Sequence, residues 1–302
     1  MLGTRHERPD RAPILVTGVP RSGTTWLARL LAQGNGLALA GREPMNPRRG
    51  QYALGGTLSG WARVTNPTPA QQRALALAYR GLNPLTYSRY GHRQWAAPWP
   101  RTRVVIKDPF AMLSVPAVMA ATGARAVLLY RHPGAVLASY RRMGWSPDLA
   151  ELRAVLASVD GSGLPELPEP GEANEVEAMC AFWSVLHALT LRDVVSDGVT
   201  SDGVHIVSHH ELASGGTPAG RTLASRLGIG WNSAMAGELS RESSTAAVAT
   251  QLHNFDRSPA EVADAWRANV STDEVEILER VAKPVWDRLE SARTRLGALR
   301  EG

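Results

Sequence analysis

Hydrophobic positions in this chain gather in short continuous runs that alternate with longer, helically spaced ones. Short apolar runs, typical of strands buried on both faces of a parallel sheet, lie at residues 13–18, 103–106, 126–130 and 204–208. Apolar residues at the 3.6-residue spacing of helices lie at residues 26–33, 113–122, 133–142 and 174–195. This alternation predicts an α/β fold with a parallel sheet flanked by helices on both faces.

Three other segments complete the pattern. Residues 51–100 are rich in Gly, Pro, Trp and Tyr, with weak periodicity apart from a helical stretch at 71–79. Residues 146–175 include a Pro/Glu/Gly-rich stretch that is typical of a loop or lid. Residues 273–296 predict an amphipathic closing helix, interrupted at Pro284. We expect one domain over residues 1–302, with 51–100 and 146–175 as insertions.

Composition narrows the class of protein. A hydrophobic share of 44% with 20% charged residues is ordinary for a soluble globular protein, and no apolar run reaches the roughly 20 residues of a membrane helix. Residues 1–12 lack the apolar stretch of a secretory signal, so we expect a cytoplasmic location. The single cysteine, Cys180, excludes an internal disulfide and a cysteine-based metal cluster.

The basic charge favours anionic partners. The formal net charge is +5, and nearly all of the basic residues are arginines, because Lys107 and Lys283 are the only lysines. No Lys/Arg block and no basic stripe interleaved with aromatic residues indicates nucleic acid. We therefore expect no nucleic-acid partner.

The segment from Gly18 to Trp26 follows the first predicted strand and opens the first predicted helix. Backbone N–H groups of such a loop point inward and the helix dipole adds positive potential, so the loop can hold a phosphate or a sulfate. A Walker phosphate loop needs a lysine after its last glycine, whereas Thr24 and Thr25 follow Gly23 here. This disfavours a nucleotide kinase or NTPase. The alternative is a tight turn whose glycines are only structural.

Within this segment, Pro20-Arg-Ser-Gly-Thr-Thr-Trp-Leu27 resembles the 5′-phosphosulfate loop of sulfotransferases that use 3′-phosphoadenosine 5′-phosphosulfate (PAPS). The resemblance implies a P-loop NTPase-like fold and an enzyme that transfers a sulfuryl group from PAPS to an acceptor hydroxyl without a metal ion. It further implies that Arg21 reaches the sulfuryl or bridging oxygen. The 5′-phosphate would then be held by Ser22, Gly23, Thr24, Thr25 and Trp26.

A second motif, Tyr130-Arg-His-Pro-Gly-Ala-Val-Leu-Ala-Ser139, places Arg131 at the end of a strand and Ser139 eight residues later, in the following helix. A guanidinium offers a bidentate clamp and a hydroxyl offers one more donor, so both can bind one anion. Taken with the first loop, this motif resembles the family's 3′-phosphate site. That implies that Arg131 and Ser139 bind the phosphate that distinguishes PAPS from adenosine phosphosulfate.

A third motif, Ile106-Lys-Asp-Pro-Phe110, resembles a segment of tyrosylprotein sulfotransferases and of bacterial relatives. A lysine at the carboxyl edge of a parallel strand points into the ligand crevice. There Lys107 can neutralise charge that develops on the leaving phosphate oxygen. The alternative for Lys107 is a solvated surface lysine, and Asp108, which precedes a proline, can simply shape a turn.

The general base is sought elsewhere, because Asp108 and Pro109 stand where steroid and phenol sulfotransferases carry a catalytic histidine. Glu43 lies 22 residues after Arg21, close to the spacing of the catalytic glutamate in tyrosylprotein sulfotransferases and bacterial relatives. The resemblance implies that Glu43 takes the proton of the acceptor hydroxyl. A solvated loop glutamate is the alternative for Glu43, and Asp108 is the alternative base.

Toward the C-terminus the resemblance is looser. His209 stands at the place of the family's adenine-contacting tyrosine, where it either stacks on adenine or serves the structure. Arg257 and Arg267 loosely resemble the family's final 3′-phosphate segment, although its glycine-rich pattern is absent. By a looser analogy still, the cofactor site would also include Ser243, Ser244 and Thr245.

The acceptor stays open among carbohydrate, glycolipid and natural-product hydroxyls. Residues 51–100 and 146–175 would form the acceptor side. Aromatic residues that either stack on an acceptor ring or belong to the core are Trp61, Tyr87, Tyr90, Trp95 and Trp99. Two rival functions are a P-loop kinase of small molecules and a non-catalytic protein that binds nucleotides or nucleic acid.

Overall fold

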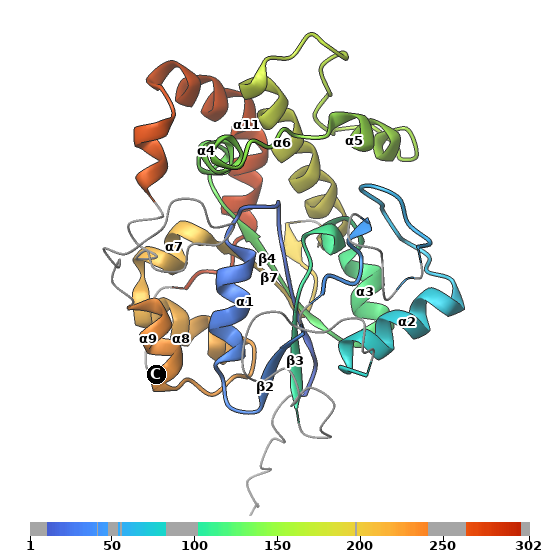
Figure 1. The fold of residues 1–302 in the computed structure, drawn as a ribbon, viewed down its shortest axis with the longest axis vertical. Helices are drawn as coiled ribbons and strands as arrows, with labels where there is room; N and C mark the ends of the chain where they lie inside the picture. The colour runs from blue at the N-terminus through green and yellow to red at the C-terminus, as the bar shows by residue number, and fades with distance from the viewer. Residues whose placement is uncertain are drawn as a thin grey trace, which may run out of the picture.

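A five-stranded parallel sheet forms the centre of the molecule (Figure 1). The computed structural model describes residues 11–40, 42–47, 54, 56–82, 102–196, 198–240 and 264–296. The strands lie in the order β2–β3–β1–β4–β7, and each neighbouring pair is parallel. Their bounds are β1 (Ile14–Thr17), β2 (Leu37–Ala40), β3 (Arg103–Lys107), β4 (Arg125–Tyr130) and β7 (Val204–Ser208).

Each face of the sheet buries its own hydrophobic core, because successive side chains of a strand point to opposite faces. Leu15 packs on one face, whereas its neighbours Ile14 and Val16 pack on the other. The core around Leu15 is covered by α2 (Pro69–Tyr79), α3 (Val115–Thr122), α4 (Pro133–Met143), α5 (Leu149–Leu156), α6 (Glu175–Val194) and α11 (Thr272–Ala292). The opposite core is covered by α1 (Thr24–Ala32), α7 (His209–Ser214), α8 (Gly216–Arg226) and α9 (Ser233–Leu239). The predicted fold class is confirmed.

The four predicted helices are also confirmed, as α1, α3, α4 and α6. Their ends follow local sequence signals. The side chain of Asn174 accepts hydrogen bonds from the first turn of α6, and Gly123, with φ 68°, ends α3 in the left-handed conformation. Shorter described elements are the 3-10 helices η4 (Pro109–Ser114) and η5 (Ala265–Asn269) and the ribbon of β5 (Val195–Ser196) and β6 (Val199–Thr200).

Three features differ from the sequence prediction. Strand β2 was not predicted, because its Leu-Ala-Leu-Ala sequence lacks the β-branched residues that mark strands. The segment 146–175 contains helix α5, whose first turn is capped by Asp148. Helix α11 runs through Pro284 without the expected interruption. Val285 and Leu289, in the turns that follow, are buried in the core, and this packing offsets the hydrogen bond that proline cannot donate.

Parallel strands bring the loops after their carboxyl ends to one edge of the sheet. The chain forms β2 and β3 on one side of β1, and then crosses to β4 and β7 on the other. In doubly wound sheets, ligands bind in the crevice where the strand order reverses, which here is beside β1. The described site residues that the sequence predicts, from Arg21 to His209, follow β1, β2, β3, β4 and β7, so the topology gathers them at this edge.

Across the described ranges, no helix combines the length and the apolar character that a membrane span requires.

Candidate active site

The loop between β1 and α1 is built on two glycines at which any side chain would be strained. Gly18 has φ 148°, and a Cβ there would lie 2.1 Å from the carbonyl oxygen of Leu129. Gly23 has φ 95°, and its Cβ would lie 2.5 Å from the ring of His209. Gly23 is also the N-cap of α1 and offers no side chain to cap it. The first N–H groups of α1 therefore face a site that suits an anion.

Two observations in this loop fit a bound group with acceptor oxygens. The Oγ of Ser22 is buried, and no other described residue forms a hydrogen bond with it. A buried hydroxyl without a partner is destabilising unless a ligand or a water supplies one. Arg21 has φ 74°, the only positive φ of a non-glycine residue in the described ranges, and backbone strain of this kind clusters at ligand sites. The loop thus fits the 5′-phosphate of the cofactor that its sequence implies.

The two predicted phosphate motifs meet at the hydroxyl of Ser139. The Nε of Arg21 donates to the Oγ of Ser139 at 2.9 Å, and the Nη2 of Arg142 donates to the same oxygen at 3.5 Å. The Nη1 of Arg131 donates to the backbone oxygen of Arg21 at 3.3 Å. Burial, and then the charge of Arg142, lower the pKa of Arg21. The charge of a bound anion would offset both effects, because it favours the protonated form of Arg21.

On the other side of β1, Glu43 lies between two donors. The Nζ of Lys107 forms an ion pair with Oε1 of Glu43, and the Nδ2 of Asn46 donates to Oε2. The side chains of Lys107 and Glu43 are 19% and 18% exposed. A carboxylate fixed at both oxygens and still reachable from solvent is suited to proton transfer with a bound substrate.

Asp108, which follows Lys107, accepts two backbone hydrogen bonds next to the ion pair of Lys107 and Glu43. It is fully buried, and its Oδ2 accepts from the N–H of Met45 at 2.6 Å while its Oδ1 accepts from the N–H of Phe110 at 3.1 Å. Burial, and then the charge of Glu43, raise its pKa to about 8. Because both oxygens hold backbone groups, Asp108 anchors the loop that carries Glu43, and a substrate hydroxyl would reach Glu43 more readily.

His209 lies against the phosphate loop. Its ring is 5.4 Å from that of Trp26, tilted by 56°, and burial followed by the charge of Arg131 lowers its pKa well below the usual value. The Nδ1 of His209 and the Nε1 of Trp26 are buried without a hydrogen-bond partner within the described part of the chain. Two buried polar atoms without partners among the described residues thus lie beside the phosphate loop. Contact with adenine stays a prediction for His209.

The C-terminal candidates divide into two groups. Arg257, Ser243, Ser244 and Thr245 lie outside the described residues. Arg267 lies over the ring of Trp266 at 4.7 Å. Trp266 in turn stacks on His132 with ring centroids 4.4 Å apart. Because His132 directly follows Arg131, η5 lies beside the second phosphate motif.

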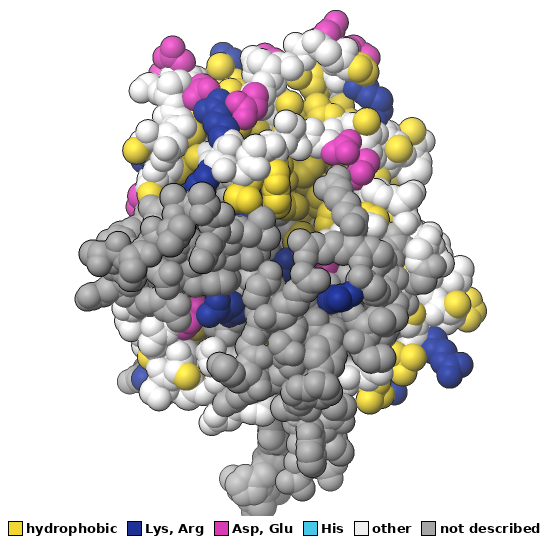
Figure 2. Space-filling model, in the orientation of Figure 1, with side chains coloured by type: hydrophobic (Ala, Val, Ile, Leu, Met, Phe, Trp, Pro, Cys, Tyr) yellow, Lys and Arg dark blue, Asp and Glu magenta, His cyan; other side chains and the backbone are white. Residues whose placement is uncertain are grey.

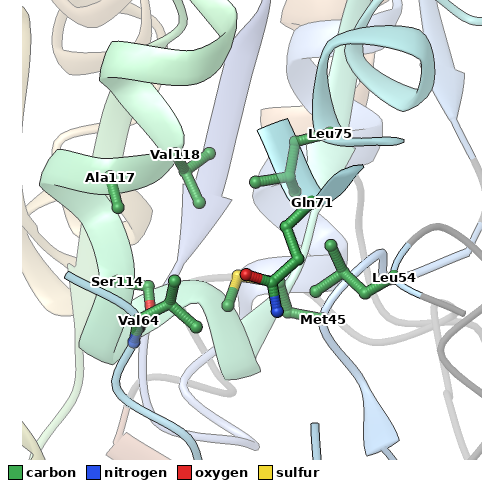
Figure 3. Close-up of a pocket in the computed structure, with 8 residues that line it drawn as sticks. All are labelled: Met45, Leu54, Val64, Gln71, Leu75, Ser114, Ala117 and Val118. Carbon is green, nitrogen blue, oxygen red and sulfur yellow. Dashed lines mark hydrogen bonds between the residues drawn. The ribbon is translucent and has the colours of Figure 1, made fainter. Parts of the chain in front are cut away.

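Of the predicted acceptor-side aromatic residues, only Trp61 is described, and it is buried. Its ring packs on Phe110 at 4.6 Å, as expected of a core residue. A hollow close to this region lies between α2, α3 and the preceding loops (Figure 3). The residues that line this hollow are Met45, Leu54, Val64, Gln71, Leu75, Ser114, Ala117 and Val118. They leave no room for a water molecule, so the hollow is not a substrate site.

Comparison with known proteins decides the family. The sequence profile described as "Sulfotransferase family" matches residues 13–232, which is most of the chain. The chain belongs to the sulfotransferase family. It is therefore an enzyme of the class that its loops resemble, and PAPS is the donor that this family uses. No curated protein sequence matches it.

Several solved structures are similar to this enzyme at low sequence identity. The sulfotransferase domain from the curacin biosynthetic pathway is 15% identical, covers 92% of this chain and 99% of its own, and has a TM-score of 0.49. A sulfotransferase from Alicyclobacillus acidocaldarius is 14% identical, with coverages of 95% and 98% and a TM-score of 0.46. Mouse sulfotransferase SULT7A1, complexed with PAP, is 14% identical, with coverages of 94% and 90% and a TM-score of 0.45.

The sequence analysis did not name three residues that the structure brings to this site. Arg142 joins Arg21 at Ser139, and Asn46 holds Glu43. Trp145 lies beneath the guanidinium of Arg21. Arg142 had a usable signal, because a residue three positions after Ser139 lies on the same helix face. Asn46 had none, since its role depends on the conformation of a loop.

Proposed function

We propose that this sulfotransferase transfers the sulfuryl group of PAPS to an acceptor hydroxyl by in-line displacement, with Glu43 as the general base. The observation that carries the proposal is the contact between the two phosphate motifs: Arg21 and Arg142 donate to the hydroxyl of Ser139, and Arg131 donates to the backbone oxygen of Arg21. Two motifs that lie more than a hundred residues apart in the sequence there form one cationic site. A nucleotide with phosphates at both the 5′ and the 3′ positions matches such a site.

The two halves of this site would hold different phosphates. The N–H groups at the start of α1, together with Ser22, Thr24 and Thr25, suit the 5′-phosphate because they are directional donors at a helix N-terminus. Arg131 and Ser139 suit the 3′-phosphate, and Arg142 adds a third donor there. Trp26 and His209 would lie beside the nucleoside.

The chemistry falls to residues after β1, β2 and β3. PAPS supplies the sulfuryl group and, as the leaving group, 3′,5′-adenosine bisphosphate (PAP). Glu43 takes the proton from the acceptor hydroxyl oxygen at a carboxylate oxygen that Lys107 and Asn46 hold in place. Lys107 and Arg21 stabilise negative charge as the bond to sulfur is exchanged. Preorganised charges of this kind act without reorienting during the reaction.

The acceptor side would be formed by residues 51–100 and 146–175 within one domain. Among the described residues, these two segments contact each other. The backbone N–H of Trp61 donates to Oε2 of Glu151 at 2.9 Å, and Gly60 lies so close to Glu151 that a Cβ would be 2.7 Å from its carboxyl carbon. This contact holds the two segments together, and Trp61 packs on Phe110, which follows β3.

A product assay distinguishes this function from its rivals. The protein is incubated with PAPS and a panel of hydroxyl compounds, and in parallel with ATP–Mg²⁺ and the same panel. We expect PAP together with an acceptor that has gained one SO₃ group, and no ADP. ADP with a phosphorylated product would establish a kinase. Tight PAPS binding with no transfer to any acceptor would favour a non-catalytic binding protein.

A further inference from the structure

Arg131 lies at the turn between β4 and α4. The residue before it, Tyr130, pairs with Ser208 in the sheet. The residue after it, His132, is the N-cap of α4, and its Nδ1 accepts from the N–H of Gly134 at 3.1 Å. The carbonyl oxygen of Arg131 thus comes after the last paired residue of β4 and before the cap of α4. A buried backbone oxygen at such a place needs a donor from elsewhere in the chain.

Trp183, on α6, provides that donor. Its indole Nε1 donates to the carbonyl oxygen of Arg131 at 2.9 Å, the usual length of an N–H···O hydrogen bond. The side chain of Trp183 is fully buried. Figure 2 shows basic side chains beside hydrophobic side chains that gather in the middle of this face, so charged groups adjoin the apolar core there. One hydrogen bond from that core therefore reaches the strand end that carries a predicted phosphate residue.

The indole of Trp183 is itself held in place. The ring of His187, one turn later on α6, lies 4.2 Å from the ring of Trp183, and its Nδ1 donates to the carbonyl oxygen of Trp183 at 2.8 Å. Burial lowers the pKa of His187 to about 4, so this ring adds no charge to the core at neutral pH. The ring of Trp286, on α11, stacks on Trp183 at 6.1 Å. The donor to Arg131 thus has a fixed position.

The direction of the Arg131 side chain depends on this hydrogen bond. A backbone oxygen that loses a buried donor is destabilised, and its peptide unit can regain a hydrogen bond only by turning toward another donor. Such a turn would redirect the guanidinium, whose Nη1 donates to the backbone oxygen of Arg21 at 3.3 Å. A guanidinium binds a phosphate through two parallel hydrogen bonds, so its affinity depends on direction as well as on charge.

We propose that Trp183 is a positioning residue for the 3′-phosphate: its indole N–H orients Arg131 and so contributes to the preference for PAP over AMP. Trp183 acts through the backbone of Arg131 and not by contact with the nucleotide. This inference rests on the proposed function, because it assumes that Arg131 binds the 3′-phosphate.

A role in core packing alone has to be separated from this one. Trp183→Phe removes the N–H and part of the ring. A second variant carries 3-benzothienylalanine at position 183, in which sulfur replaces the indole N–H while the ring keeps its shape, and it provides the test if Trp183→Phe fails to fold. Trp286→Phe trims an indole that stacks on Trp183 and is the packing control.

Calorimetry measures PAP and AMP binding to the full chain, to these variants, and to Arg131→Ala with and without Trp183→Phe. We expect both replacements of Trp183 to weaken PAP binding about 10-fold and to leave AMP binding within about 3-fold. Trp286→Phe should stay within about 3-fold for both nucleotides. In the Arg131→Ala background, Trp183→Phe should weaken PAP binding by less than about 3-fold, because the side chain that it orients is absent.

Unchanged PAP binding in the benzothienylalanine variant would overturn the inference, and so would equal losses for PAP and AMP. A full 10-fold effect of Trp183→Phe in the Arg131→Ala background, or an equal effect of Trp286→Phe, would assign Trp183 to packing alone. In all of these cases a wild type that prefers PAP would still support the proposed function. A wild type that does not prefer PAP over AMP would instead overturn the proposed function itself.

Discussion

The charged groups on the two sides of β1 are arranged differently. Toward β4, Arg21 and Arg142 donate to the hydroxyl of Ser139, and Arg131 donates to the backbone oxygen of Arg21. Burial, and then the charge of Arg142, lower the pKa of Arg21. Toward β3, Lys107 is matched to the carboxylate of Glu43. The first side is a cluster of cations that suits an added anion, whereas the second is already neutralised and holds a proton acceptor at a fixed point.

This difference separates binding from chemistry. Changes on the cation side should act mainly on nucleotide affinity, because they remove counter-charges to phosphate. Substitutions on the ion-pair side should mainly lower kcat, because they remove groups that act while the proton leaves the acceptor hydroxyl. If both kinds of change affected both quantities equally, the division would be wrong.

The largest effect is expected on the ion-pair side. Glu43→Gln should lower kcat by about 100- to 10,000-fold, because an amide cannot take the hydroxyl proton, while PAP affinity stays within about 3-fold. Initial rates with an acceptor that the wild type sulfates, together with PAP calorimetry, measure the two quantities. Glu276→Gln, an exposed site on α11, is the control and should change neither. A Glu43→Gln variant with near wild-type kcat would assign the base to another group.

Asn46 provides a further test of the ion-pair side, because it is proposed to position Glu43 without contacting the substrate. Asn46→Ala should lower kcat roughly 30-fold, the size expected for one lost hydrogen bond to a charged group, and should leave PAP affinity unchanged. The kcat–pH profile separates positioning from folding. Its acidic limb should shift in Asn46→Ala, whereas a variant that is merely less stable would keep the profile at lower amplitude.

Arg142 tests whether the cation side binds the 3′-phosphate. Arg142→Ala should weaken PAP binding about 10-fold and AMP binding hardly at all, because AMP lacks the 3′-phosphate that Arg142 is proposed to contact. Calorimetry with both nucleotides at two salt concentrations provides the comparison. An equal loss for PAP and AMP would place Arg142 at the 5′-phosphate instead.

The smallest effect concerns the uncharged His132 beside the arginines. Burial, then the charges of Arg267 and Arg131, lower its pKa to about 4, whereas the unfolded chain has a pKa near 6.5. Since the unfolded state binds more protons between these values, the stability contribution is present at pH 7 and is lost as the pH falls. From pH 7 to pH 5.5 the wild type should lose about 1 kcal/mol relative to His132→Asn, which keeps a cap for α4. Urea unfolding at both pH values tests this, and a constant difference would contradict it.

The features that could be predicted from the sequence are those that short, local sequence patterns determine. The strands around the phosphate loop, the helix after it and the second motif with Arg131 and Ser139 follow from short sequence patterns, because glycine geometry and strand-to-helix turns are local properties. Strand β2 was missed because its pairing with β3, and not its own sequence, makes it a strand. The roles of Asn46 and Trp183 depend on contacts with distant segments. Only the fold provides those contacts.

The central claim is that the two motifs together form one site for a bisphosphorylated nucleotide. The most direct test is calorimetric titration of the wild type and of Arg131→Ala with PAP and with AMP. The account predicts that the wild type prefers PAP, and that Arg131→Ala loses most of this preference, through PAP binding weakened by about 100-fold, while AMP affinity stays within about 3-fold. A wild type that binds both nucleotides equally, or a variant that keeps its preference for PAP, would contradict it.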